Sequence, residues 1–169
     1  MKFWALLVII FAQIVILAGE YGNAVYPLWT GQEIKLKTVP VDPRSLFRGN
    51  YARLRYDIST VKSPQLAKKV RNGEVVYIEL QADEQGIYQF KQLHLKQPDS
   101  GIYIRGRLQQ RYRSQENYRI RYGIEAYFAP KDKALALQKD LRDGGIALVM
   151  LSKNGKATLK AVIAPKETP

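Results

Sequence analysis

The sequence of 169 residues contains no cysteine and only one histidine, His94. Without cysteine the chain cannot form a disulfide framework, a thiolate metal site or a cysteine nucleophile. A single histidine excludes a metal site built from several histidines of one chain. We therefore expect no metal site and no cofactor, and we interpret His94 as a strand residue rather than a ligand.

Acidic residues are in the minority. The chain has 27 Lys and Arg residues against 15 Asp and Glu residues, which gives a formal net charge of +12. Only Lys2 and Glu20 are charged before residue 30, so the excess lies in the rest of the chain. A basic domain is attracted to anionic surfaces, and charge alone does not choose among lipid headgroups, acidic glycans, nucleic acid and an acidic protein patch.

The N-terminal segment has almost no polar residues. Residues 3–18 are apolar except for Gln13, and Lys2 precedes them. Such a start is typical of a signal peptide or of an uncleaved signal anchor. We favour the anchor because small residues are poorly placed for cleavage around Ala18 and Gly19.

A continued helix would let this segment cross a membrane, and Pro27 is expected to end it. Trp4 and Trp29 would then lie at the two interfaces, about 37 Å apart, with residues 4–28 in contact with the lipid bilayer. The predicted domains are an N-terminal transmembrane signal anchor at residues 1–29 and an extracytoplasmic β domain at residues 30–169.

Glu20 would lie near the outer end of this helix. It is either an ordinary residue of the membrane border or a counter-charge for a helix of a partner protein. A large folded domain is translocated regardless of its own charge, so we expect the amino terminus inside and the β domain outside.

Beyond residue 30, apolar and polar residues alternate in short runs that are separated by turn residues. This pattern predicts a mainly β fold, an antiparallel barrel-like or sandwich-like domain of about seven strands. One helix is expected at residues 131–143 and a shorter one at residues 65–70. The expected strands are residues 33–39, 51–58, 74–82, 87–95, 102–113, 118–128, 146–151 and 157–163.

The clearest expected hairpin, formed by residues 102–113 and 118–128, carries arginines on one face and mainly apolar residues and tyrosines on the other. We call it the arginine hairpin. Opposed residues share a face, and a register with Arg111 opposite Arg121 satisfies this condition. That register places Arg107 opposite Glu125, whereas a shift of two residues places Arg105 there instead. In either case we expect Glu125 to meet an arginine.

Residues 49–56 read Gly-Asn-Tyr-Ala-Arg-Leu-Arg-Tyr and resemble the signature of the GDYXXLXY family. The resemblance covers nearly the whole chain. It implies a bacterial membrane-anchored protein of uncharacterised function in the cell envelope, with a membrane protein as partner, and it implies no known reaction. The family has Asp where this chain has Asn50, and the lost charge favours a structural corner over a catalytic one. The other matching blocks are residues 41–44, 46–48, 121–125 and 127–130.

We therefore predict a single-pass protein of the bacterial inner membrane whose β domain faces the periplasm or the outside. Its expected role is non-catalytic: it binds or supports another membrane or envelope component. The alternative is a polyanion-binding or ligand-binding module at an anionic surface. A third is a hydrolase of the Ser–Lys type, with Ser45 as the nucleophile and Lys68 or Lys69 as the base.

The candidate binding residues lie on the basic face and around the corner that begins at Pro40. Nucleic acid is not an expected partner, because most tyrosines point away from the arginines and because the domain is exported. The binding candidates are Asp42, Arg44, Arg48, Tyr51, Arg53, Arg55, Tyr56, Arg105, Arg107, Arg111, Arg113, Arg119, Arg121 and Glu125.

Overall fold

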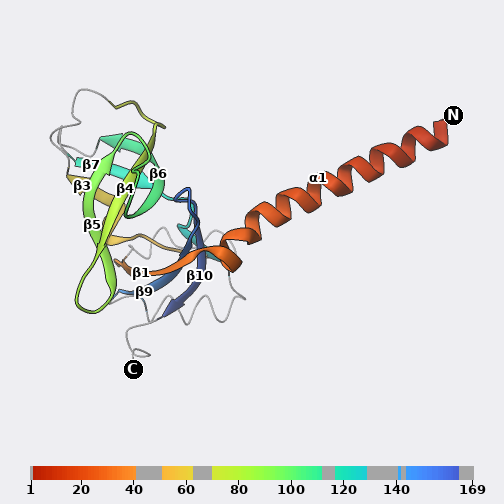
Figure 1. The fold of residues 1–169 in the computed structure, drawn as a ribbon. Coiled ribbons are helices and arrows are strands. Elements are labelled where there is room, and N and C mark those ends of the chain that lie inside the picture. Colours follow the sequence, from red (N-terminus) through yellow and green to blue (C-terminus); the bar gives the residue numbers. More distant parts are fainter. Residues whose placement is uncertain are drawn as a thin grey trace.

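The structure is a computed structural model, and it describes residues 2–40, 51–62, 70–111, 117–128, 141 and 144–163. Within these residues the chain forms one long N-terminal helix, ten strands and one short 3-10 turn (Figure 1). The prediction of a mainly β fold with one N-terminal apolar helix is confirmed. The helices expected at residues 65–70 and 131–143 lie outside the described residues, apart from Val70 and Leu141.

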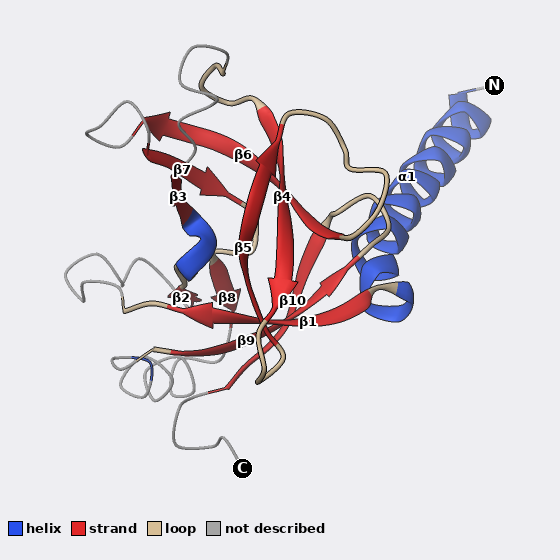
Figure 2. Cartoon of the chain, turned by 60° about the vertical axis from the view of Figure 1, so that its left-hand side comes forward, coloured by secondary structure: helices blue, strands red, loops and turns tan. Residues whose placement is uncertain are grey.

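Eight strands form one sheet in the order β10-β9-β1-β5-β4-β6-β7-β3, and β2 pairs with β8 separately (Figure 2). All pairings are antiparallel except that of β1 with β5, which is parallel. The sheet is open, because it does not close into a barrel within the described residues. The strands are β1 (Gln32–Thr38), β2 (Tyr51–Arg53), β3 (Thr60–Lys62), β4 (Val75–Ala82), β5 (Ile87–His94), β6 (Ile102–Arg111), β7 (Asn117–Arg121), β8 (Ala126–Phe128), β9 (Gly145–Leu151) and β10 (Ala157–Ile163).

The helix α1 (Lys2–Thr30) extends away from the sheet (Figure 1). Most of its apolar side chains are exposed. By length and composition it is able to cross a membrane, which suggests a single-pass anchor. The expected end at Pro27 is wrong, because the helix continues to Thr30. Proline has no N–H to donate to the carbonyl of Asn23, one turn earlier. Lys156 Nζ donates to that carbonyl instead, at 3.2 Å.

The hydrophobic core is formed by alternate residues of the long strands, as the alternating pattern predicted. Leu36 on β1, Ile78 on β4 and Ile104 on β6 are completely buried. Gly106 allows Ile120 to pack across β6, since a Cβ at residue 106 would approach the Ile120 Cγ2 to 2.4 Å. The chain therefore needs glycine at this point of the sheet.

The strand expected at residues 51–58 is shorter than predicted, because β2 ends at Arg53. The Tyr56 N–H donates to Ser59 Oγ at 3.1 Å, and Ser59 N–H donates back to the Tyr56 carbonyl at 2.9 Å. This serine turn forms the 3-10 segment η2 (Asp57–Ser59), which separates β2 from β3. The alternation of burial persists through the break: Leu54, Tyr56 and Ile58 are buried, and Arg53, Arg55 and Asp57 are exposed.

The predicted register of the arginine hairpin is also wrong. Arg107 pairs with Arg121, and a bulge follows between Leu108 and Gln110. Because β7 ends at Arg121, Glu125 has no partner on β6. Gly123 has a φ of +85°, a conformation that glycine adopts without strain, and the chain leaves the large sheet there to form β8.

Candidate functional site

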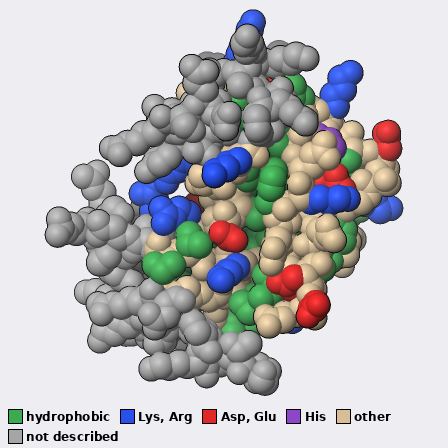
Figure 3. Space-filling view, turned by 90° about the vertical axis from the view of Figure 1, so that its left-hand side faces the viewer, with side chains coloured by type: hydrophobic (Ala, Val, Ile, Leu, Met, Phe, Trp, Pro, Cys, Tyr) green, Lys and Arg blue, Asp and Glu red, His purple; other side chains and the backbone are tan. Residues whose placement is uncertain are grey.

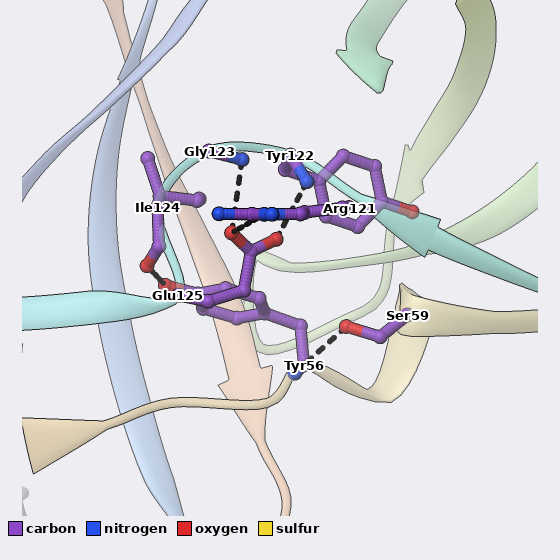
Figure 4. Close-up of polar contacts among 7 residues, drawn as sticks. All are labelled: Tyr56, Ser59, Arg121, Tyr122, Gly123, Ile124 and Glu125. Atoms are coloured by element: carbon purple, nitrogen blue, oxygen red, sulfur yellow. Dashed lines mark hydrogen bonds and ion pairs between the residues drawn. The ribbon is translucent and has the colours of Figure 1, made fainter. Parts of the chain in front are cut away.

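The two sequence blocks that resemble the family lie side by side in the structure. Tyr51 on β2 pairs with Phe128 on β8, and the Leu54 N–H donates to the Glu125 carbonyl at 2.8 Å. We call residues 53–59 together with residues 121–125 the motif crossing, and Figure 4 shows polar contacts within it. The two segments are far apart in sequence, so these contacts join distant parts of the β domain.

Two buried tyrosines hold the motif crossing together by reciprocal hydrogen bonds. The Tyr56 hydroxyl donates to the Ile124 carbonyl at 2.6 Å, and the Tyr122 hydroxyl donates to the Ile58 carbonyl at 2.6 Å. Each phenol therefore satisfies a backbone acceptor of the other segment. Burial, and secondarily the negative charge of Glu125, raises the pKa of both Tyr56 and Tyr122 well above the ordinary phenol range. Both hydroxyls remain neutral donors at physiological pH.

Glu125 holds the corner at which the chain leaves the large sheet. Its carboxylate accepts the N–H of Tyr122 at 2.6 Å and the N–H of Gly123 at 3.0 Å (Figure 4). Arg121 Nε lies 3.8 Å from the same carboxylate, with the arginine side chain 64% exposed. The expected contact of Glu125 with an arginine is thus present, but its partner is Arg121 rather than Arg105 or Arg107. Two backbone donors occupy the carboxylate, so its main role here is structural.

The outer side of the motif crossing carries charged side chains around a hollow. The hollow has a volume of about 390 Å³. Arg55 is exposed and donates through Nη2 to the Pro40 carbonyl at 3.0 Å, which fixes its position at the rim. Two guanidinium groups and a hydroxyl at one hollow can bind an anionic group, and the Asp57 carboxylate limits the positive charge. The lining residues are Val39, Arg55, Tyr56, Asp57, Thr60 and Arg119.

The described arginines of the predicted basic face lie on the outward side of β6 and β7: Arg107 pairs with Arg121, and Arg105 and Arg119 are each two residues away along their strands. Arg55 and Arg119 share the hollow, whereas Arg105 lies opposite Tyr77 of β4 and Arg107 donates to the Gly73 carbonyl at 3.1 Å. On the side of the molecule turned away from α1, basic side chains alternate with acidic ones (Figure 3). The described arginines therefore share one side of the hairpin and differ in what they contact.

Several predicted site residues cannot be placed from the structure. Tyr51 and Arg111 belong to β2 and β6, but their side chains are not described. The remaining positions lie outside the described residues, and they include the serine and lysines of the hydrolase hypothesis. These positions are Asp42, Arg44, Arg48, Arg113, Ser45, Lys68 and Lys69.

Sequence reasoning missed a second polar cluster on β4 and β5. Glu79 Oε1 accepts a hydrogen bond from Lys91 Nζ at 2.6 Å, and Glu79 Oε2 lies 2.9 Å from His94 Nε2. The hydrogen bond from Lys91, and next that from His94, lowers the pKa of Glu79. His94 is the last residue of β5, so its expected place on a strand is confirmed. The cluster depends on the register of the β4–β5 hairpin, which the sequence pattern does not specify.

An open hollow of about 680 Å³ lies next to this cluster. Glu79, His94 and Ser100 all line it, and these residue types occur together in hydrolytic relays. The structure has no hydrogen bond between His94 and Ser100, both of which it describes. The three side chains are therefore neighbours at one hollow without the contacts of a relay.

Comparison with known proteins gives a family and nothing more specific. The family model described as GDYXXLXY protein matches residues 13–162. Neither the curated proteins nor the solved structures include a significant match to this chain. The family is of uncharacterised function, so the match adds no reaction and no ligand. Because the match covers most of the sequence, including both segments of the motif crossing, the chain belongs to the GDYXXLXY family.

Proposed function

We propose that the protein is a membrane-anchored accessory subunit that binds an acidic surface of another membrane or envelope protein. The observation that carries this proposal is the division of the motif crossing into two sides. Its tyrosines and aliphatic residues are buried and hydrogen-bonded, whereas Arg53 and Arg55 project outward from the same segment. A rigid support with exposed guanidinium groups is suited to recognition, since Arg pairs with carboxylates in a bidentate geometry.

The charges on the outer side support binding rather than internal stabilisation. Among the described residues, no carboxylate forms an ion pair with Arg53, Arg55 or Arg119. Their positive charge therefore remains available to an acidic partner, and complementary charge increases the rate and specificity of association.

The anchor sets where this partner is found. In our proposal α1 crosses the bacterial inner membrane with its amino terminus inside, and the β domain faces the periplasm. The partner is then a membrane protein with an acidic periplasmic surface, or another component held near the membrane.

Co-purification from native membranes tests this proposal. The full chain is expressed at its native level, crosslinked in intact cells and purified, and the co-purifying proteins are identified and quantified. We expect one specific partner, and we expect Arg53→Glu with Arg55→Glu to remove it. Lys35→Glu with Lys37→Glu on β1 is the matched control, because it changes the net charge equally at another exposed site. Recovery of no partner, or equal loss in both variants, would contradict the proposal.

A second candidate function is binding of a small anionic ligand or a polyanion. The hollow lined by Arg55, Thr60 and Arg119 favours it, because its volume of about 390 Å³ admits a carboxylate or phosphate group. Titration of the purified full chain with inorganic phosphate and with heparin distinguishes this function. Saturable binding that Arg119→Gln abolishes would support a ligand site over a protein partner.

The hydrolase remains the third candidate, and it rests on Ser45. A Ser45→Ala variant that keeps full function in cells would remove it. Loss of function in that variant at normal protein level would favour the hydrolase over the accessory role.

A further inference from the structure

The turn between β9 and β10 lies against the domain end of α1. Leu151 lies close to Gly31: a Cβ at residue 31 would approach the Leu151 carbonyl oxygen to 2.9 Å. The turn begins directly after Leu151, and within it Lys156 Nζ donates to the Asn23 carbonyl at 3.2 Å. That carbonyl is free because Pro27 has no N–H. The turn is thus attached to the helix by a contact that the proline makes possible.

The length of α1 defines the depth at which this contact lies. A hydrocarbon core of about 30 Å needs about 20 helical residues at a rise of 1.5 Å each. Counted from Phe3, these residues end at Gly22, so Asn23 follows at the outer border of the core. The Lys156 ammonium group therefore lies at the depth of the lipid headgroups if α1 crosses a membrane.

The same turn is held rigidly against β6. The Tyr103 hydroxyl donates to the Lys153 carbonyl at 2.5 Å, and the Arg105 N–H donates to the Gly155 carbonyl at 2.8 Å. A Cβ at Gly155 would approach the Tyr103 ring to 2.8 Å, so the packing is close. These contacts bring Lys153 and Arg105 to the vicinity of Lys156.

We call Arg105, Lys153 and Lys156 the headgroup surface. Within the part of the chain that the structure describes, none of the three forms an ion pair with a carboxylate. Lys153 and Arg105 are exposed, and Lys156 is half-buried beside the helix. Arg105 and Lys153 are thus held next to Lys156, whose ammonium group contacts the helix at Asn23.

Two aromatic residues follow Asn23 within the next two turns of α1. Trp29 is 80% exposed and Tyr26 is 59% exposed, although both lie at the end of the helix that joins the domain. Indole and phenol rings favour the membrane–water interface because they are amphipathic. Their exposure is expected if lipid, rather than protein, covers this end of the helix.

We infer that the headgroup surface binds the phosphate groups of anionic phospholipids and so fixes the orientation of the β domain on the membrane. The inference rests on the proposed anchoring by α1. Two arguments favour lipid as the occupant: the surface continues the apolar helix directly, and its charge is complementary to that of an anionic leaflet. The domain is then held against the bilayer rather than on a free tether.

Lysine footprinting of the full chain tests this inference. The protein is reconstituted into vesicles of phosphatidylcholine alone or mixed with phosphatidylglycerol, and a membrane-impermeant amine reagent is applied. Lys37 is the internal control, because it is exposed near the far end of β1. We expect phosphatidylglycerol to lower the ratio of Lys153 to Lys37 labelling by about fivefold, which corresponds to the roughly 1 kcal/mol that one basic residue gains at an anionic surface.

A variant pair provides the second measurement. Lys153→Gln should lower the fraction of phosphatidylglycerol that co-purifies with the protein in detergent-free membrane particles. The matched variant Lys37→Gln removes one charge at a distant exposed site and should leave that fraction unchanged. Lys153 is chosen because only its backbone takes part in the contacts of the turn.

The outcomes separate this inference from the anchoring on which it rests. If carbonate extraction leaves the protein in the vesicles but the labelling ratio is the same in both lipids, the headgroup surface is refuted and the anchor stands. Protection of Lys153 in native membranes but not in vesicles would also refute it, because an acidic protein would then be the occupant. Release of the protein by carbonate would overturn the anchoring and this inference together.

Discussion

The two sides of the motif crossing differ in exposure, in hydrogen bonding and in charge. On the inner side Tyr56 is 1% exposed and Tyr122 is 7% exposed, and both phenols donate to carbonyls of the opposite segment. On the outer side Arg53, Arg55 and Asp57 are exposed. The same short segment supplies both sides, because burial alternates from one residue to the next.

This difference separates what stabilises the fold from what is available for binding. In the family signature, the leucine and the last tyrosine correspond to Leu54 and Tyr56, which are buried. Arg53 and Arg55 occupy positions that the signature leaves open. These two signature positions therefore stabilise the fold, whereas the exposed arginines lie on the side open to a partner.

Removing a tyrosine ring from the inner side is the strongest test of the difference. Tyr56→Ala should lower the free energy of unfolding by about 3–5 kcal/mol, because it creates a cavity and leaves the Ile124 carbonyl without its donor. Chemical denaturation of the full chain in detergent micelles measures the change. Arg53→Ala is the matched control on the outer side, and we expect a change within about 0.5 kcal/mol. Equal losses in the two variants would contradict the division.

Removing only a hydroxyl sharpens the comparison. Tyr122→Phe keeps the ring and leaves the Ile58 carbonyl unpaired in the core, so we expect a loss of about 1–3 kcal/mol. The same denaturation experiment measures it, with exposed Tyr26→Phe on α1 as the control. A loss near zero would mean that water replaces the phenol at this carbonyl.

Alkaline pH distinguishes the two sides without a large change of structure. Tyr56 and Tyr122 have a raised pKa in the folded state, whereas the unfolded phenol titrates near pH 10. The stability that the two neutral phenols contribute is fully present below about pH 10. It is lost as the pH rises from there toward the pKa of the folded state, because over this range only the unfolded chain releases these protons. Each phenol should then lower the free energy of unfolding by about 1.4 kcal/mol per pH unit. Denaturation at several pH values should show a shallower decline in Tyr122→Phe, and an unchanged slope would refute the burial of this group.

Changes on the outer side should have the smallest effect on stability. Arg55→Gln with Arg119→Gln should change the free energy of unfolding by less than about 1 kcal/mol, since neither residue forms an ion pair with a described carboxylate. Arg55 does lose its contact with Pro40, and Arg119→Gln alone shows how much that contact contributes. A loss as large as that of Tyr122→Phe would place these arginines among the structural residues.

The sequence predicted which residues are buried more accurately than it predicted how the strands pair. Alternation correctly placed Leu54, Tyr56 and Ile58 inside, because burial follows the period of the pattern even where the strand is interrupted. The interruption of the strand after Arg53 depends on Ser59, whose hydroxyl oxygen accepts a hydrogen bond from the N–H of Tyr56. Periodicity contains no signal for such a contact.

Register and long-range pairing were not accessible from the pattern. The bulge after Leu108 and the corner at Gly123 move Glu125 away from Arg107. The alternation of apolar and polar residues predicts neither feature. The parallel pairing of β1 with β5 joins strands that are distant in sequence. The hydrogen bonds between Glu79, Lys91 and His94 depend on a register in the same way. The candidate site could therefore be predicted as a set of residue types but not as an arrangement.

The central claim is that the inner side of the motif crossing holds the fold and the outer side binds a partner. Its most direct test uses two variants: a double variant that carries Arg53→Gln and Arg55→Gln, and the single variant Tyr56→Phe. For each, the amount of crosslinked partner per molecule of folded protein is measured in native membranes. We predict that the arginine variant keeps normal stability and loses the partner, whereas the folded fraction of Tyr56→Phe retains it. Retention of the partner at the wild-type level in the arginine variant would contradict the account.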